Sequence, residues 1–385
     1  MKISKLGLSI AESTTLKLNE TFNTLKSQGI PVIHLGGGEP FGKASRLSIE
    51  LAEKLLKTGV VRYSPSAGTK ELRQAVCDYT EKFYGFKPDI NNVIISNGAK
   101  QAIFISLLSI INPDDEVLFV NPYWVSYPEM VKLAYGKPVH FIPSSKNFIP
   151  TIEEFKKNIT PKTKAILINS PNNPTGVMYP ESLITELVKL TAEKNIYLIM
   201  DDIYHRLVFD NKQHPSVLKK STFAEDSHLI IVNGISKSFA MTGFRIGWAI
   251  ASPKLIKVMT NIQSHQTGGP SPLLQKAALG AITGTQNEVK QLKEMLEENR
   301  NLMIELLSQL KNVNIIKPDG TFYLFADFSY YEKDSLKLSA SLLEKAKVLT
   351  MPGIAFGLDG HLRLSFCNNR EVITEGVKRI ISILK

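Results

Sequence analysis

The sequence has little cysteine and no long hydrophobic run. Of its 385 residues only two are cysteines, Cys77 and Cys367; they lie far apart, outside any CxxC pair and without histidines at metal-ligand spacing. This excludes a disulfide framework and a cysteine metal centre, so we expect two reduced, structural thiols and no bound metal. No run of 18 apolar residues occurs, which excludes a transmembrane helix.

The N-terminus also lacks a secretory signal, because Glu12 interrupts the first residues before an apolar core can form. We therefore expect a cytoplasmic protein. Lys and Arg exceed Asp and Glu, 46 against 36, giving a formal net charge of +10. Since no basic tail or nucleic-acid motif accompanies this excess, we expect neither nucleic acid nor membrane as a partner. The charge is better explained by attraction of anionic substrates and a phosphorylated cofactor.

Short apolar runs alternate with helical segments, at 100–111, 123–133 and 180–194, through the middle of the chain. The runs lie at 93–95, 117–120, 165–168, 197–200, 229–232 and 247–251. Continuous apolar strands between helices predict an α/β fold with a mostly parallel sheet covered on both faces. We expect a large domain over residues 46–275, and a small α/β domain made of residues 1–45 and 276–385. In the small domain we expect a long helix over 288–311 and half-buried strands at 320–328 and 361–366.

One segment, residues 236–247, carries a lysine and an arginine on the connection between two predicted strands. Its sequence is SKSFAMTGFRIG, with Lys237 and Arg245 eight residues apart. Ligands bind at the C-terminal ends of strands in such sheets. A neutral lysine attacks a carbonyl, and an arginine binds phosphate oxygens with paired hydrogen bonds. The segment therefore predicts a site for an aldehyde cofactor with a phosphate group.

Two other segments end predicted strands with polar side chains: NSPNNPTG at 169–176 and YLIMDDIY at 197–204. In this order and spacing the three segments resemble class I aminotransferases of the pyridoxal phosphate fold type I superfamily, closest to the bacterial aspartate aminotransferase subgroup. The resemblance spans nearly the whole chain. It implies a large domain with a mostly parallel seven-stranded sheet, a smaller α/β domain, pyridoxal 5'-phosphate as cofactor and a homodimer.

The resemblance also implies roles for residues around the cofactor ring. Lys237 would bind the aldehyde covalently and move the substrate's α proton, which requires a neutral amine. Asp201 would face the pyridine nitrogen and keep it protonated, whereas the neighbouring Asp202 is interpreted as a solvated loop carboxylate. Asn173 and Tyr204 would hydrogen-bond the phenolic oxygen. Trp124 matches the aromatic residue that stacks on the ring.

For the cofactor phosphate, the resemblance implies Arg245 together with a helix start, a natural phosphate site. The backbone around Gly98, Ala99 and Lys100 would supply N–H groups, and Tyr63 would reach across from a second subunit. Many relatives carry serine where this chain has Gly234. Ser236 is expected to supply the missing hydroxyl.

Substrate binding is expected to use Arg363 for the α-carboxylate, with Gly38, Trp124 and Asn173 beside it. After Pro40 this chain has phenylalanine where relatives usually have aspartate, so the loop after Pro40 can close over the site in a different way.

Two matches favour an acidic substrate. Lys100 stands where the subgroup places a lysine against the distal carboxylate, and Thr15 matches a polar partner there. Ala11 stands where prephenate-using members tend to carry a lysine, which disfavours that substrate. Against an acidic substrate, residues 267–272 (TGGPSP) depart from the loop that completes the pocket from the neighbouring subunit.

The sequence therefore predicts a homodimeric, pyridoxal phosphate-dependent aminotransferase of amino acid metabolism. It would move amino groups between aspartate or glutamate and a 2-oxo acid by a ping-pong cycle. An aminotransferase for aromatic, kynurenine or alanine-like substrates, and a lyase or decarboxylase on the same fold, remain alternatives. The alternative outside the enzymes is an amino-acid sensor.

Overall fold

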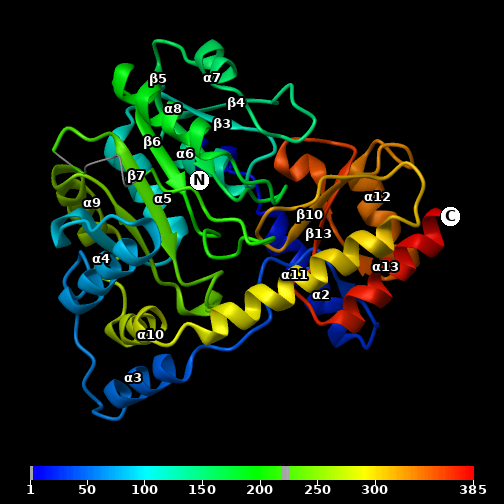
Figure 1. Ribbon diagram of the computed structural model, residues 1–385, viewed down its shortest axis with the longest axis horizontal. Helices are drawn as coiled ribbons and strands as arrows, with labels where there is room; N and C mark the ends of the chain where they lie inside the picture. The colour runs from blue at the N-terminus through cyan, green and yellow to red at the C-terminus, as the bar shows by residue number, and fades with distance from the viewer. Residues whose placement is uncertain (1–2, 218–222, 224) are drawn as a thin grey trace.

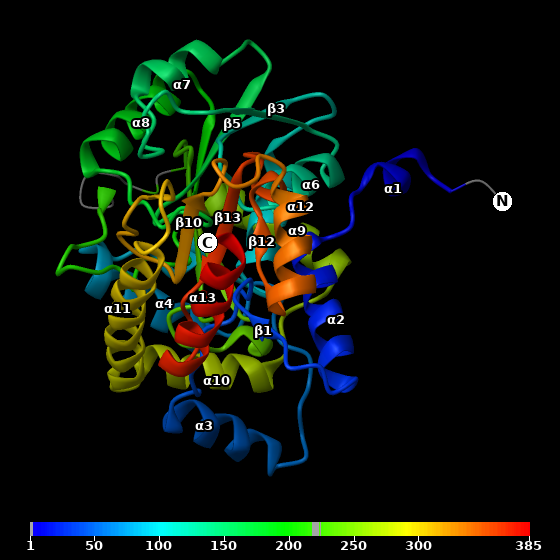
Figure 2. The same cartoon turned by 90° about the vertical axis from the view of Figure 1, so that its right-hand side faces the viewer.

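The computed structural model describes residues 3–217, 223 and 225–385, and the side chain of Thr15 lies outside this description. Figure 1 shows two α/β bodies side by side, bridged by the long helix α11 (Asn287–Leu307). One body is built on a seven-stranded sheet and the other on a four-stranded sheet. Turned by 90°, the molecule shows helices α2 (Thr14–Ser27) and α13 (Arg370–Leu384) beside the smaller sheet (Figure 2).

The larger sheet is mostly parallel, as expected. Only β8 runs antiparallel to its neighbours β2 and β7; the other adjacent strands are parallel. In spatial order the strands are β2 (Val93–Ser96), β8 (Gly247–Ile250), β7 (Leu229–Gly234), β6 (Tyr197–Asp201), β5 (Thr163–Asn169), β3 (Glu116–Val120) and β4 (Lys137–Phe141).

Helices cover both faces of this sheet, which explains why its strands are continuously apolar. In β6, Leu198 and Met200 pack into one core and Ile199 into the other. Burying one such side chain contributes about 1.5–3 kcal/mol. The first core takes residues from α4 (Lys70–Tyr84), α8 (Glu181–Glu193) and α10 (Pro272–Thr283). The second takes residues from α5 (Ala99–Ile110), α6 (Ser126–Leu133) and α9 (Pro253–Gln266).

The smaller sheet is antiparallel, and its two central strands are more buried than expected. Its order is β12 (Met351–Pro352), β13 (His361–Ser365), β10 (Tyr323–Asp327) and β9 (Asn314–Ile315). The prediction of half-buried strands was wrong, since β10 and β13 are buried along both faces except at Asp327 and His361. Leu324 packs into the small-domain core, while Phe325 on the opposite face packs against Met351 and Phe356.

Two predicted helices differ at their ends. The segment after Pro122 becomes helical only at Ser126, so Tyr123 and Trp124 lie on a bend before α6. Helix α11 ends at Leu307 instead of reaching 311, and Asn312 adopts a left-handed conformation soon afterwards (φ 60°). None of the described helices has the length and apolar character needed to cross a membrane.

The remaining elements are short or peripheral. The two-stranded parallel sheet pairs β1 (Ile33–His34) with β11 (Val348–Leu349). The other α-helices are α1 (Lys5–Ser9), α3 (Arg46–Leu56), α7 (Ile152–Asn158) and α12 (Ser335–Ser341).

Candidate active site

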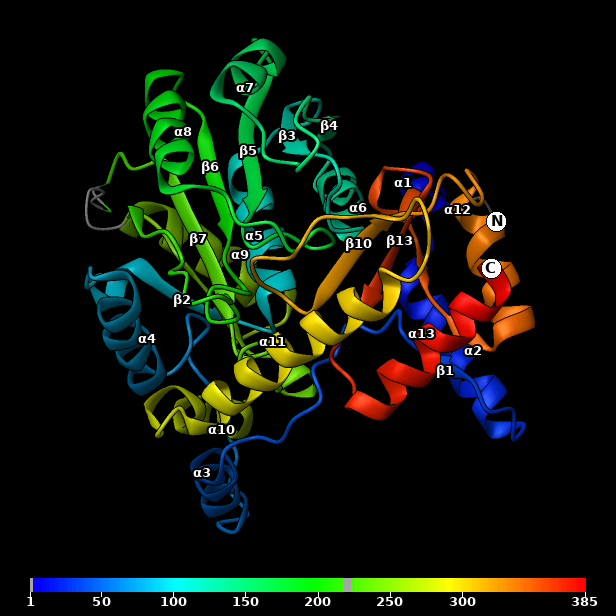
Figure 3. The same ribbon diagram turned by 45° about the vertical axis from the view of Figure 1, so that its right-hand side comes forward.

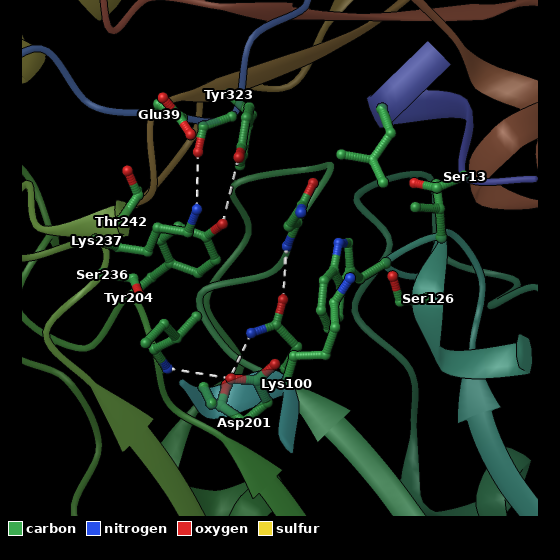
Figure 4. A pocket seen from close by; sticks show the side chains of 18 of the residues that line it. Ser13, Glu39, Lys100, Ser126, Asp201, Tyr204, Ser236, Lys237, Thr242 and Tyr323 are labelled. Atoms are coloured by element: carbon green, nitrogen blue, oxygen red, sulfur yellow. Dashed lines mark hydrogen bonds between the residues drawn. The ribbon is translucent and has the colours of Figure 1, made fainter. Parts of the chain in front are cut away.

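A cavity of about 420 Å³ lies where the ends of the large-sheet strands meet the small domain (Figure 4). Strands β5 and β6 end at Asn169 and Asp201, and β7 leads into Lys237 three residues after its end. The lining residues that the sequence predicted are Gly38, Ala99, Lys100, Trp124, Asn173, Asp201, Tyr204, Ser236, Lys237, Arg245 and Arg363. The fold therefore brings segments from the whole chain to one place.

Lys237 is partly exposed to the cavity but surrounded by protein. Its Nζ donates a hydrogen bond to the carbonyl of Gly38 at 2.7 Å. Burial lowers the pKa of Lys237 to about 8; the nearby charge of Arg363 acts in the same direction, and Glu39 opposes it. A substantial fraction of this amine is therefore neutral near pH 8, as nucleophilic attack on an aldehyde requires.

Asp201 ends β6 and is buried. One carboxylate oxygen accepts a hydrogen bond from the Tyr127 hydroxyl at 2.7 Å, and the other accepts from the Ile203 N–H at 3.3 Å. Burial raises the pKa of Asp201 to about 6, and these two donors limit the rise. A carboxylate held in this way is suited to pairing with a protonated ring nitrogen.

Asp202 is not the solvated carboxylate that we expected. It is 1% exposed and accepts a hydrogen bond from the Tyr84 hydroxyl at 3.1 Å. Burial raises the pKa of Asp202 to about 7. Because the strand alternates, Asp202 lies away from the cavity lining, in the core on the other side of β6.

Arg363 is buried and held on several sides. Its Nη1 donates to Asn173 Oδ1 at 2.9 Å, and its Nη2 donates to the carbonyl of Gly36 at 2.8 Å. The guanidinium lies 4.1 Å from the centre of the Tyr323 ring and 4.9 Å from that of Phe356. Its Nε is buried without a partner among the described atoms, and none of the described carboxylates pairs with it. The cation is therefore available for an anionic ligand.

An anion site lies at the start of α5. Gly98 precedes the helix with a positive φ (85°), which residues other than glycine rarely adopt, and a Cβ there would lie 2.4 Å from Arg245 Nη2. Only glycine therefore lets the guanidinium approach this helix start. Within the described chain no hydrogen bond uses the N–H of Ala99 or Lys100. Free amides at a helix N-terminus beside an arginine form a site for phosphate.

The other cavity residues surround these groups. Trp124 packs edge-on against Tyr127, with ring centres 5.4 Å apart, and the Nζ of Lys100 lies 4.9 Å from the Trp124 ring centre. Packing removes part of the hydration of Lys100 and lowers its pKa, as does the charge of Arg245. Tyr204 is buried, and its hydroxyl lies 3.4 Å from that of Tyr323.

Gly234, which the resemblance marked as a departure from serine, has no space for a side chain. A Cβ there would lie 2.9 Å from the carbonyl of Ile246 and 3.0 Å from the Cα of Gly247. Ser236 is buried and lines the cavity. The role of Ser236 as a substitute for the missing hydroxyl stays a prediction.

Among the predicted site residues that the structure describes, Tyr63 and Gly98 do not line the cavity of this chain. Tyr63 is fully exposed on the segment after α3, and its contribution from a second subunit stays a prediction. The Thr15 side chain lies outside the described residues. Gly98 contributes by leaving space for Arg245 to approach the start of α5. The 267–272 segment packs on the Tyr63 segment instead, where Ser64 donates to the Pro270 carbonyl at 2.8 Å.

Several residues of the site were not predicted from the sequence. Tyr127 lies three residues after Trp124, but nothing in the sequence indicated that it would contact Asp201. Tyr323 stacks on Arg363 from the neighbouring strand β10, and Asn19 lines the cavity from α2. Strand pairing and helix packing create these contacts, so no local pattern could have revealed them.

The residues fit pyridoxal phosphate in three chemical features. The free amides of α5 and Arg245 suit a phosphate, Lys237 offers an amine for the aldehyde, and Asp201 offers a carboxylate for the ring nitrogen. The cofactor is of drug-like size, and a cavity of about 420 Å³ lies in the range typical of such ligands.

Comparison with known proteins also indicates an aminotransferase. Residues 30–380 match the family profile described as aminotransferase class I and II. An aspartate aminotransferase of Bacillus subtilis is 37% identical over 386 residues, covering 99% of this chain and 98% of that protein. An aspartate/prephenate aminotransferase of Thermus thermophilus is 35% identical over 387 residues, covering 99% and 98%.

Solved structures extend the agreement to the fold. The structure of an aspartate aminotransferase from Thermus thermophilus with maleate superposes with a TM-score of 0.94 at 34% identity and covers 100% of both chains. The expected fold type I architecture and the expected pyridoxal phosphate-dependent transaminase chemistry are thereby confirmed. The chain belongs to the class I and II aminotransferases.

Proposed function

We propose that this enzyme is a homodimer that transfers the amino group between aspartate or glutamate and a 2-oxo acid. The observation that carries the proposal is a pair of cations in one cavity. Lys100 and Arg363 both line it, and neither forms an ion pair with any described residue. A dicarboxylic substrate supplies two anions for these two cations. The names of the relatives support this substrate class.

Lys237 would perform the proton transfer. When bound, pyridoxal phosphate supplies a conjugated ring that accepts the electron pair released at the substrate α carbon. The amine of Lys237, with its pKa lowered to about 8, would accept the substrate's α proton at Nζ and later release it within the cavity. The Gly38 carbonyl, which accepts from Nζ at 2.7 Å, holds the amine towards the cavity.

Asp201 would keep the ring nitrogen protonated. Its negative charge is oriented by Tyr127 and the Ile203 N–H, so it is available without rearrangement. Asn173 and Tyr204 would hydrogen-bond the phenolic oxygen, with Trp124 on the ring face. The α5 amides, Arg245 and Ser236 would hold the phosphate.

Arg363 would bind the substrate α-carboxylate and Lys100 the distal carboxylate. The unpartnered Nε of Arg363 supports the first role, because a carboxylate can satisfy this buried donor together with a second N–H. Gly38 lies beside Tyr323, where a Cβ would come within 3.2 Å of the hydroxyl, and it leaves room for the substrate backbone. Thr15 stays a candidate partner of the distal group.

The dimer would use the surface around α3. This helix projects from the body (Figure 3), and Ile49, Leu56, Val60 and Tyr63 are exposed on or just after it. A contiguous group of large exposed apolar side chains is typical of an association surface. In the dimer, Tyr63 would reach the phosphate of the partner's cofactor.

We also propose the domain division 46–275 for the large domain and 1–45 with 276–385 for the small one. The separate cores of the two sheets support it. A cytoplasmic location is supported by the two free, buried cysteines.

An absorbance titration tests the substrate proposal. The purified, cofactor-loaded protein is mixed in turn with aspartate, glutamate, alanine, phenylalanine and kynurenine, and conversion to pyridoxamine phosphate is followed together with the 2-oxo acid product. Selective conversion by aspartate and glutamate is expected. Preference for aromatic or small amino acids would overturn the substrate class, and bleaching without a matching 2-oxo acid would indicate a lyase or decarboxylase.

A further inference from the structure

His34, at the end of β1, forms hydrogen bonds in two directions. The Gly36 N–H donates to its Nδ1 at 3.2 Å, and its Nε2 lies 2.8 Å from Asn19 Oδ1. A backbone N–H can only donate, so Nδ1 must carry the lone pair and Nε2 the hydrogen. These two contacts fix His34 as one neutral tautomer that accepts from Gly36 and donates to Asn19.

Asn19, which accepts the hydrogen bond from His34 Nε2, belongs to a lightly packed wall of the cavity. Helix α2 contributes Leu16 and Asn19 to the lining, yet none of its described residues is buried. Within the described chain, the Asn19–His34 bond is the one hydrogen bond joining α2 to a segment beyond the helix and its flanking loops. Phe22 packs on the same imidazole, with ring centres 4.9 Å apart. Figures 2 and 3 both show α2 beside β1. His34 is thus the main polar attachment of this wall.

Gly36, the other partner of His34, also contacts Arg363, the arginine proposed to bind the substrate. The Gly36 residue that donates to His34 also accepts from Arg363 Nη2 through its carbonyl, at 2.8 Å. Gly36 is buried and closely packed: a Cβ there would lie 3.2 Å from the backbone of Thr350 and 3.3 Å from Leu349. The close packing leaves Gly36 few alternative positions, and the hydrogen bond to His34 fixes its backbone among them, so this contact helps to set the direction of the carbonyl that holds the guanidinium.

We propose that His34 is a positioning residue that couples the α2 wall of the cavity to Arg363. Through Asn19, His34 and Gly36, the surface that meets the substrate side chain and the cation that binds its α-carboxylate are held at a set separation. The chain therefore selects small dicarboxylates and amino acids of matching length. This inference rests on the proposed function, because it takes Arg363 as the carboxylate anchor.

Two conservative substitutions separate the two contacts. In His34→Asn the side-chain oxygen can replace Nδ1 and accept from Gly36, but the bond to Asn19 is lost. In His34→Gln the terminal amide can replace Nε2 and donate to Asn19, but the acceptor for Gly36 is lost. Asn19→Ala removes the same contact as His34→Asn from the other side. All are prepared as cofactor-loaded protein, with thermal midpoint and cofactor dissociation constant recorded as controls.

The readouts are the dissociation constant for maleate, by calorimetry, and the KM and kcat for aspartate and alanine. For Asn19→Ala and His34→Asn we expect maleate to bind about fivefold more weakly and the KM for aspartate to rise about fivefold, because one hydrogen bond is lost. The KM for alanine should be nearly unchanged. The double variant should equal either single one. His34→Gln should raise the KM of both amino acids. In every variant kcat and cofactor affinity should stay close to wild type.

Unchanged maleate binding, additive effects in the double variant, or equal losses for aspartate and alanine in Asn19→Ala would overturn the coupling. A fall in thermal midpoint with no selective change in KM would show a merely structural role and also overturn it. If the wild-type protein itself neither binds maleate nor converts aspartate, the proposed function fails and the inference fails with it. Normal wild-type behaviour with unaffected variants rejects the inference alone.

Discussion

The chemical centre and the outer wall of the cavity are built in different ways. The centre consists of Asp201, Asn173 and Arg363, which are 2–5% exposed and form hydrogen bonds within one chain, together with Lys237. The outer wall contains Lys100, Arg245 and helix α2, which are exposed or only partly buried. Burial shifts the pKa values of the central groups, and for Lys237 in the direction that the chemistry needs. Exposure leaves the outer cations free to bind different anionic groups. Under the proposed function, the reacting groups therefore come from one chain, and the choice of substrate depends on less tightly packed surfaces.

The largest effect should come from the centre. Lys237→Ala removes the one amine placed to move the α proton, and we expect transamination of aspartate to fall by roughly a thousandfold or more. Single-turnover kinetics of the half-reaction measure the loss. Circular dichroism and the exposed-site variant Lys257→Ala serve as controls. Transamination at the wild-type rate would contradict the mechanism.

Arg363→Lys should have the next largest effect. The charge is retained, but the two-pronged geometry is lost and the contacts with Gly36 and Asn173 are broken, so we expect kcat/KM for every amino acid to fall by about a hundredfold. Steady-state kinetics with aspartate and alanine check the result. A loss confined to aspartate would show that Arg363 binds the distal group.

Lys100→Met tests the outer wall. Removing a cation that pairs with the distal carboxylate should lower kcat/KM for aspartate and glutamate by roughly 10- to 100-fold, as for a hydrogen bond to a charged group. Alanine should be little affected, and Lys100→Arg should recover part of the loss. Equal losses for alanine and aspartate would mean that Lys100 acts on the cofactor or the fold.

Tyr63→Phe tests whether the outer wall extends into a second subunit. Loss of one hydroxyl contact to the phosphate should weaken cofactor affinity about fivefold without changing the oligomeric state. Equilibrium dialysis and sedimentation velocity measure the two quantities, with the exposed Tyr135→Phe as matched control. Unchanged affinity would remove Tyr63 from the site.

The smallest effect concerns Asp202, behind the centre. Its pKa is about 7 in the folded protein, above the value of about 3.9 for an unfolded chain. Between these values the folded state binds more protons, so this group stabilises the fold at low pH and loses that contribution as pH rises from about 4 through 7. Asp202→Asn should flatten this part of the pH dependence, measured as urea midpoints of the cofactor-free protein from pH 4.5 to 8. Asp226→Asn, at an exposed position, should leave it unchanged.

The alternating apolar runs and helical segments predicted six of the seven strands of the large sheet; they missed the edge strand β4, none of whose residues is buried. Every predicted strand of the large sheet exists, because continuous burial on two faces leaves a clear apolar signal in a single segment. The small-domain strands were found, but their degree of burial was not. The second face of β10 is covered by Phe356 and Met351, and the chain reaches these residues only after further turns.

The motifs indicated Lys237, Asp201, Asn173 and Arg245, which lie close to strand ends, whereas Arg363, in the middle of β13, was indicated by the family resemblance. What the sequence by itself determined is the identity of the reacting groups and the sheet that carries them. The tertiary structure alone decided that Asp202 is buried, that Tyr127 orients Asp201, and that His34 joins Asn19 to the Gly36–Arg363 contact. Those relations depend on distances between segments up to 327 residues apart, and such distances are set by the packing of the two bodies and not by any local pattern.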